Sequence, residues 1–132
     1  MNTRFHSLCT PQWILRIAVA GEFVGHGIFA LQGKEGWFKY FTPFGITDEQ
    51  TIVTILLIVG IVDILLAIHV LVRPVRLFVL WMAFWGLWTA LVRWPFGPDP
   101  FWDFVERSAN WGAPLSLLLI LGWPKKAREW IS

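Results

Sequence analysis

Residues 51–72 form a mainly aliphatic run with one charged side chain, Asp63. A run of this length provides the roughly 20 apolar residues that a helix needs to cross the hydrocarbon core of a bilayer. Three further apolar stretches occupy residues 13–31, 75–94 and 100–123. The chain is 56% hydrophobic and 15% charged, which is too apolar for an ordinary soluble domain of 132 residues. We therefore expect an all-α fold, a membrane four-helix bundle that forms a single transmembrane domain over residues 1–132.

The distribution of charge predicts the orientation of these spans. Cations gather near the two termini and in the turn between the second and third spans, whereas acids gather in the other two loops. The first group is Arg4, Arg16, Arg73, Arg76, Lys125, Lys126 and Arg128, and the acids are Glu35, Asp48, Glu49, Asp99, Asp103 and Glu106. Because cytoplasmic loops carry the excess of Lys and Arg, we expect a multi-pass protein of the cytoplasmic (inner) membrane with both termini cytoplasmic.

The loop between the first and second spans has an aromatic centre, Trp-Phe-Lys-Tyr-Phe at residues 37–41. Glycines and prolines flank this centre, and the pattern predicts an interfacial segment that lies at the level of the lipid headgroups. Three helix starts are also expected: Pro11 for the first span, Thr47 as the cap of the second, and Asp99 as the cap of the fourth.

Glu22 and His26 are the most unusual pair in the first span. They are spaced i, i+4, so on a helix they share one face, and glycines at 21, 25 and 27 remove bulk around them. An ionisable side chain inside a membrane span is costly and by default indicates a functional site. We hypothesise that Glu22 and His26 exchange a proton with a bound ligand.

Depth along the membrane normal groups other polar residues with this pair. With a rise of ~1.5 Å per residue, Glu22 and Asp63 both lie roughly 13 Å from the cytoplasmic ends of their spans. His26, Thr89 and Asn110 form a second level at roughly 19 Å. The second span also has a side of small residues, which allows another helix to approach closely. That side contains Gly60, Asp63 and Ala67.

A third level, at roughly 26 Å, contains Arg93 and Glu106, which we expect to pair near the outer interface. Trp85, Trp88 and Trp111 would form the apolar walls around the polar column. The sequence therefore predicts a ligand pocket between the helices. The competing interpretation is that these polar groups pair only with one another and hold the helices in register.

Several kinds of site are disfavoured. A haem held by two histidines is disfavoured because His26 and His69 differ in depth by roughly 15 Å. The sequence shows no convincing metal-ligand spacing and no nucleic-acid surface. Cys9 is the single cysteine, so an internal disulfide is excluded, and we assign it no role.

The first span has an arginine, then a glycine, then a Phe-x-x-His-Gly run, at Arg16, Gly21, Phe23, His26 and Gly27. This pattern resembles the DoxX-like family of small four-helix membrane proteins. Further along, the resemblance rests on Phe44, Gly45 and Ile46 before the second span, and on Gly60 and Asp63 within it. Family members include a subunit of a thiosulfate:quinone oxidoreductase, so the resemblance implies a redox- or quinone-related membrane role. The chain departs from the family in lacking a cysteine pair for sulfur chemistry, and in having Phe29, Ala30 and Leu31 where many relatives continue with Lys-Leu.

Three functions compete at this point. In the first, the pocket binds a quinone or another small apolar molecule within the bilayer. In the second, the chain is a non-enzymatic accessory or structural subunit, and its small-residue faces pack against partner membrane subunits or a second copy. In the third, it is a small transporter. An occupied pocket would favour the first function, and co-purifying proteins would favour the second.

Overall fold

The computed structural model describes the backbone of residues 3–132 and the side chains from Thr10 onward, so the side chains of Arg4 and Cys9 lie outside the described part. Every regular element in that part is helical. The long helices are α1 (Thr3–Leu31), α2 (Glu49–Val72), α3 (Arg76–Leu91) and α5 (Ser108–Leu121). Shorter elements are η1 (Glu35–Tyr40), η2 (Thr42–Phe44), α4 (Phe101–Glu106) and η3 (Ala127–Trp130).

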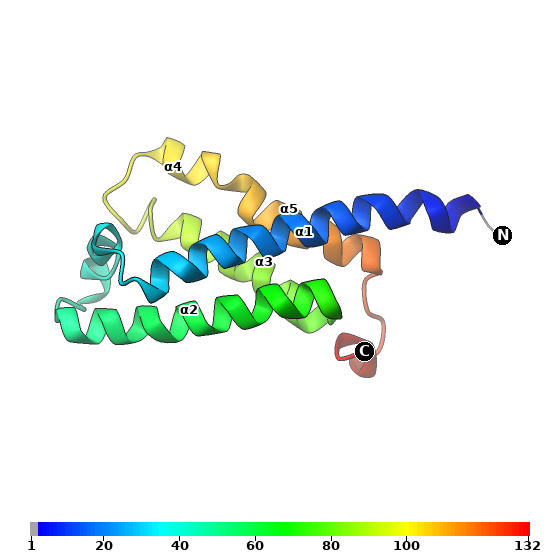
Figure 1. The fold of residues 1–132 in the computed structure, drawn as a ribbon. Helices are drawn as coiled ribbons and strands as arrows, with labels where there is room; N and C mark the ends of the chain where they lie inside the picture. Colours follow the sequence, from blue (N-terminus) through cyan, green and yellow to red (C-terminus); the bar gives the residue numbers. More distant parts are fainter. Residues whose placement is uncertain (1–2) are drawn as a thin grey trace.

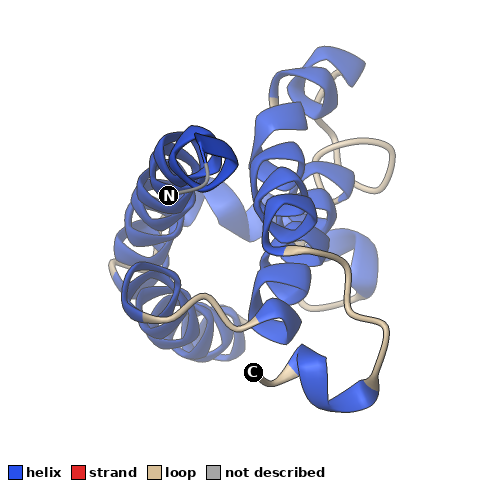
Figure 2. Cartoon of the chain, turned by 90° about the vertical axis from the view of Figure 1, so that its right-hand side faces the viewer, coloured by secondary structure: helices blue, strands red, loops and turns tan. Residues whose placement is uncertain are grey.

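The long helices form two antiparallel pairs (Figures 1 and 2). In one pair α1 packs along α2, and in the other α3 packs along α5. The two pairs are joined mainly by α1 and α5, whereas α2 and α3 make few contacts with each other. The beginning of α1 and the C-terminus lie at the same end of the molecule. Space for a cavity is thus left on the side where α2 and α3 diverge.

The helix boundaries correct several expectations. The first helix begins at Thr3 and contains Pro11 in its interior, so Pro11 does not start it. The fourth span is broken at Arg107 into α4 and α5. Within the described part, the segments long and apolar enough to cross a membrane are Thr10–Leu31 and Glu49–Val72, and Arg76–Leu91 is a shorter apolar helix.

Arg16 and a pair of glycines set the register between α1 and α2. The buried Arg16 side chain donates from Nε to the carbonyl oxygen of Val70 over 2.8 Å, and from Nη2 to that of Leu71. These carbonyls belong to the last turn of α2, where a cation is favourable. Near the other end, a Cβ built on Gly60 would lie 2.8 Å from the carbonyl oxygen of Gly27. This contact confirms that the small side of the second span admits another helix.

Arg76 connects the start of α3 to the end of α5 through the same kind of hydrogen bond, from a guanidinium group to backbone carbonyls. Its Nε donates to the carbonyl oxygen of Gly122 over 2.9 Å and its Nη2 to that of Leu121 over 2.6 Å. The two arginines therefore each satisfy carbonyl groups that a helix C-terminus leaves unpaired.

Two apolar clusters lie on either side of the divergence between α2 and α3. The larger is near the termini and includes Val19, Phe23, Val79, Met82 and Leu117. The smaller is at the opposite end, where Trp37 and Tyr40 of η1 pack with Ala30, Ile52 and Leu56.

The segment between α1 and α2 is therefore folded onto the bundle rather than spread along its surface. At its end, Asp48 caps α2, one residue after the expected Thr47: its Oδ2 accepts from the backbone N–H of Thr51 over 2.8 Å. Hydrogen bonds from the hydroxyl and backbone N–H of Thr51 lower the pKa of Asp48.

Candidate functional site

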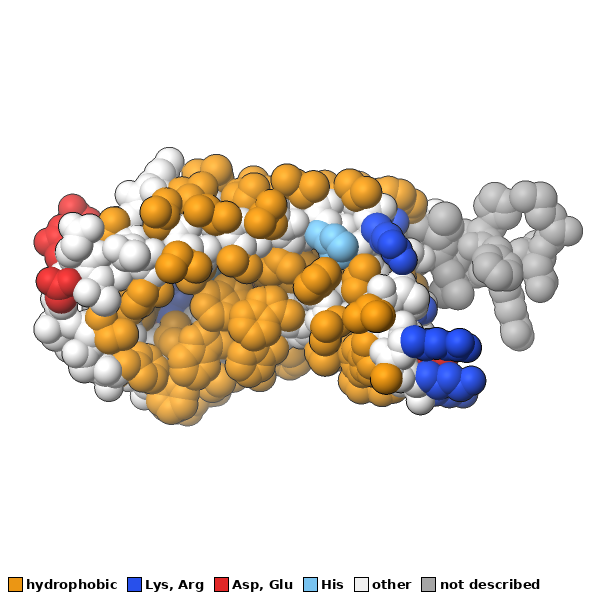
Figure 3. Space-filling model, turned by 90° about the horizontal axis from the view of Figure 1, so that it is seen from below, with side chains coloured by type: hydrophobic (Ala, Val, Ile, Leu, Met, Phe, Trp, Pro, Cys, Tyr) orange, Lys and Arg blue, Asp and Glu red, His pale blue; other side chains and the backbone are white. Residues whose placement is uncertain are grey.

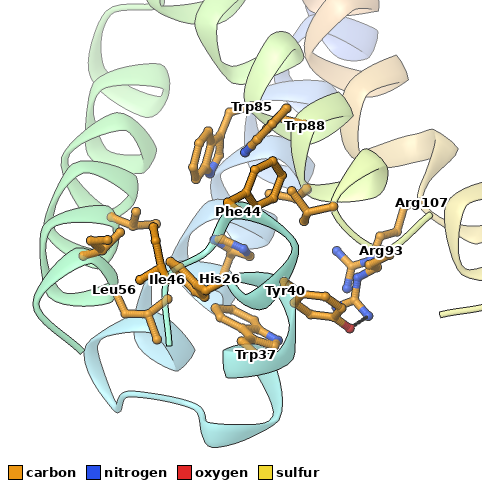
Figure 4. Close-up of a pocket in the computed structure, with 15 residues that line it drawn as sticks. His26, Trp37, Tyr40, Phe44, Ile46, Leu56, Trp85, Trp88, Arg93 and Arg107 are labelled. Carbon is orange, nitrogen blue, oxygen red and sulfur yellow. Dashed lines mark hydrogen bonds between the residues drawn. The ribbon is translucent and has the colours of Figure 1, made fainter. Parts of the chain in front are cut away.

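A cavity of about 290 Å³ lies between α2 and α3, beneath η1 and η2. Aromatic and aliphatic side chains form most of its wall. The lining residues are His26, Trp37, Tyr40, Phe41, Phe44, Ile46, Ile55, Leu56, Val59, Trp85, Trp88, Thr89, Val92, Arg93 and Arg107. Figure 4 shows Trp85, Trp88 and Phe44 on one side of the opening and Trp37 on the other, with His26 between them. Figure 3, which views the molecule from below, shows a hollow in the apolar surface with a cation at its bottom.

His26 and Asp63 form the polar centre of this site. The Nδ1 atom of His26 lies 2.6 Å from Oδ2 of Asp63, and Asp63 is 1% exposed. The predicted levels grouped Asp63 with Glu22, whereas the structure pairs the Asp63 carboxylate with His26. The Arg16 and Gly27 contacts shift the two helices by one to two residues, roughly 3 Å or less, from the register that the assumed span ends gave.

The environment of His26 fixes which ring nitrogen faces a ligand. The contact with Asp63 occupies Nδ1 of His26. When the Asp63 carboxylate is ionised it only accepts hydrogen bonds, so Nδ1 then carries the proton and Nε2 is the nitrogen left for a ligand. The imidazole stacks on Trp37, with ring centroids 4.6 Å apart and an interplanar angle of 26°. The buried indole N–H of Trp85 lies near the Asp63 carboxylate, but the two groups do not meet the geometry of a hydrogen bond.

At the far side of the cavity, Tyr40 and Arg93 join Asp99 and Lys39 in one network. The Tyr40 hydroxyl donates to Oδ2 of Asp99 over 2.5 Å and accepts from Nη1 of Arg93 over 2.7 Å. Nζ of Lys39 donates to Oδ1 of Asp99 over 2.6 Å. The network fastens η1 to the loop after α3, so η1 covers that end of the cavity.

This network overturns two expectations. Arg93 pairs with Asp99 and Tyr40 rather than with Glu106, which is exposed. Asp99 does not cap α4. The N-cap residue of that helix is Pro100, and no side chain caps it with a hydrogen bond. The physical reason is that the half-buried Asp99 carboxylate lies within reach of Lys39 and Tyr40 from η1 and of Arg93 from its own loop.

The same contacts perturb the ionisation of the network. Burial opposes the ionisation of Asp99, but hydrogen bonds from Lys39 and Tyr40 outweigh burial and lower the pKa of its carboxyl group. Burial, together with the hydrogen bond to Asp99, raises the pKa of Tyr40. The Asp99 carboxylate and the protonated Tyr40 hydroxyl therefore stay in the states that hold the network.

The remaining predicted site residues are dispersed. Glu22 is half-buried one turn from His26, outside the cavity wall. Thr89 lines the cavity, but its hydroxyl donates to the carbonyl oxygen of Gly86 on its own helix over 2.9 Å. Asn110 lies where α5 crosses Gly86, and Trp111 has a buried indole N–H without a hydrogen-bond partner. Of the predicted residues, the structure brings His26, Trp85, Trp88, Thr89 and Arg93 to the cavity, with Asp63 behind His26.

The contributions of η1, η2 and Arg107 to the cavity wall were not predicted from the sequence. The density of aromatic residues at 37–41, directly after the span that carries His26, was the available signal for η1 and η2. For Arg107, the signal was a second cation near the expected depth of Arg93. Among the described residues, no three His, Cys, Asp or Glu side chains gather into a set that could hold a metal ion.

The fold and the cavity together define an all-helical protein with two helices long and apolar enough to span a membrane, and with a mainly aromatic pocket backed by a His–Asp pair. No family model, curated protein or solved structure matches the chain.

Proposed function

We propose that this chain is a multi-pass membrane protein of the cytoplasmic membrane. The support is that the outer sides of α1, α2 and α3 expose large apolar side chains. Only 33% of the most apolar window of α2 is buried within the structure, and Leu65 and Ile58 on its outer side are 61% and 58% exposed. Contiguous exposed apolar surface of this kind suits a lipid environment. Figure 3 shows cations gathered at one end of this apolar surface and acids at the other.

Membership of the DoxX-like family is part of the proposal. The residues that carry the resemblance act as one packing unit. Arg16 binds the end of α2, Gly27 lies against Gly60, and His26 pairs with Asp63. These residues on two helices thus share one structural role: they set the register that brings His26 and Asp63 together.

We further propose that the cavity binds a small lipid-soluble molecule with a hydrogen-bonding oxygen, for which a quinone is the redox example that the resemblance suggests. The observation that carries this proposal is His26 at the cavity wall with its Nδ1 held by the buried Asp63. Nε2 would contact the ligand oxygen, while Trp37, Trp85 and Phe44 would pack on its apolar body. A volume of about 290 Å³ lies near the lower end of ligand pockets, so the ligand is small.

His26 can also exchange a proton with such an oxygen, because each nitrogen of an imidazole ring can either hold or accept a proton. The carboxylate of Asp63 orients the ring and stabilises the imidazolium form. Since Glu22 lies outside the cavity wall, we assign the proton exchange to His26 with Asp63, and give Glu22 no direct contact with the ligand.

In the test, the full chain is purified in lipid nanodiscs and titrated with a short-chain quinone. Binding is measured by the quenching of tryptophan fluorescence. We expect saturable quenching in the wild type. His26→Ala should weaken binding about tenfold, as expected for the loss of one hydrogen bond to an ionisable partner. The matched control is His69→Ala, because His69 contacts Phe78 and lies away from the cavity wall.

Equal affinity of wild type and His26→Ala would contradict the role of His26. The absence of saturable quenching by quinone and other small apolar probes would contradict the binding function. Native mass spectrometry then tests the accessory-subunit alternative, which predicts stable co-purifying proteins in place of a bound small molecule.

A further inference from the structure

Arg107 is a cavity-lining cation that the proposed quinone does not use. It lies at the junction of α4 and α5, and its side chain contributes to the wall of the cavity. Its Nε atom is buried and has no hydrogen-bond partner. No ion pair in the described part of the chain includes Arg107. A guanidinium N–H that is buried without a partner is costly, because that donor has lost water and gained no hydrogen bond.

A second cation lies nearby. Arg93 lines the same cavity and acts on Arg107 through like-charge repulsion. Nη1 of Arg93 is bonded to Tyr40 and to Asp99, and the Asp99 carboxylate is already shared with Lys39. Glu22 and Glu106 attract Arg107 electrostatically, but neither forms a salt bridge with it. Within the described residues, Arg107 is therefore the cation at this end of the cavity that no carboxylate contacts.

The opposite side of the cavity is apolar. Figure 4 shows Arg93 and Arg107 together on one side, beyond Tyr40, with Leu56 and Ile46 on the other. The cavity wall is thus polarised, with donors at one side and hydrocarbon at the other. An amphiphile matches this arrangement, whereas a neutral quinone would leave Arg107 without a partner.

We propose that the natural ligand is a small amphipathic acid, whose carboxylate binds Arg107 beside Arg93 and whose apolar body extends toward α2. This inference rests on the proposed binding function of the same cavity. A carboxylate is favoured because it matches the planar fork of a guanidinium group. The cavity volume suits a single short chain or a ring with a short chain, rather than a two-chain phospholipid.

The experiment compares two probes that differ only in the head group, bromoundecanoate and bromoundecanol. The bromine atom of each quenches tryptophan fluorescence when the chain enters the cavity. With the full chain in nanodiscs of neutral lipid at alkaline pH, we expect the acid to bind about tenfold more tightly than the alcohol, the effect of one charge-assisted contact. Arg107→Gln should remove this preference by weakening the acid alone, and Arg107→Lys should retain part of it because the charge remains.

Arg73→Gln is the matched control, because Arg73 is an exposed cation far from the cavity wall, and it should leave both affinities unchanged. The alcohol serves as the measure of folding, since its binding should survive in every variant. Equal binding of acid and alcohol in the wild type, or an unchanged preference in Arg107→Gln, would overturn the inference while quinone binding still stood. Displacement of the acid by inorganic phosphate would also overturn it, because the site would then be one for a small anion. Failure of the acid, the alcohol and the quinone alike would overturn the binding function together with this inference.

Discussion

The carbonyl oxygen of Asn110 in α5 lies directly against the backbone of Gly86 in α3. A Cβ built on Gly86 would be 2.2 Å from that oxygen, well inside van der Waals contact. The carbonyl of Asn110 is available because Pro114, four residues later, has no N–H to donate to it. The glycine thus permits a close crossing that holds the α3–α5 pair together, and a weak Cα–H···O contact accompanies such crossings.

Gly86→Ala should therefore lower the free energy of unfolding by about 2–3 kcal/mol, because the added methyl group meets backbone atoms that cannot move independently. Gly112→Ala is the control, since nothing lies within 4 Å of the position where its Cβ would be. In a helix interior that change should stabilise by about 0.5–1 kcal/mol. Unfolding in mixed micelles measures both, and equal stabilities of the two variants would contradict the close crossing.

The His26–Asp63 pair predicts a non-additive pair of mutations. His26→Ala leaves Asp63 buried without its partner and should destabilise by about 3 kcal/mol. The double variant His26→Ala, Asp63→Leu removes both polar groups and should recover much of that loss. The same unfolding measurement applies, with His69→Ala as the single-histidine control. If the double variant loses the sum of the two single losses, the pair is not coupled as the 2.6 Å contact implies.

The network at Asp99 predicts a pH dependence outside the proposed spans. Its folded-state pKa is lowered, so the stabilisation is complete above the unfolded value of ~3.9 and is lost as pH falls through the lower folded value. Carboxyl-carbon NMR of protein labelled at aspartate should show Asp99 titrating below that ordinary value. Lys39→Gln should raise the pKa of Asp99, because it removes the hydrogen bond to Oδ1. Titration of Asp99 at the ordinary value in the wild type would count against the network.

Membrane topology is tested by labelling single cysteines in a Cys9→Ser background. Ser132→Cys lies beside the C-terminus and Glu35→Cys begins η1, at the opposite end of the molecule. With both termini cytoplasmic, a membrane-impermeant maleimide should label Glu35→Cys in intact cells, and should label Ser132→Cys only after the membrane is opened. Labelling of both positions in intact cells would contradict the proposed four-span topology.

Much of the fold was predictable because it depends on local sequence. The apolar runs at residues 13–31 and 51–72 gave the two long helices, and the small side chains around Gly60 gave a close helix contact. Residues 75–94 and 100–123 also proved helical, but the latter is broken at Arg107. Its break is a local event that hydropathy alone does not reveal.

The candidate site was predictable only in part. His26 and Asp63 were identified because ionisable groups are rare in apolar runs. Their pairing was not predictable, since it requires the offset between two helices, and an error of two residues in that offset changes every cross-helix partner. The burial of Trp37 and Tyr40 was also missed, because the path of a loop depends on which surface is left uncovered nearby.

The sequence by itself determined that this protein is helical and apolar, and that a histidine and an aspartate interrupt its first two long apolar runs. Only the tertiary structure decided that these two side chains meet, that η1 closes over them, and that Arg93 and Arg107 lie on one wall of the same cavity. The physical reason is that hydropathy and helix periodicity are properties of neighbouring residues. Register and enclosure arise from contacts between distant ones, here the backbone contact of Gly27 with Gly60 and the hydrogen bonds of Arg16.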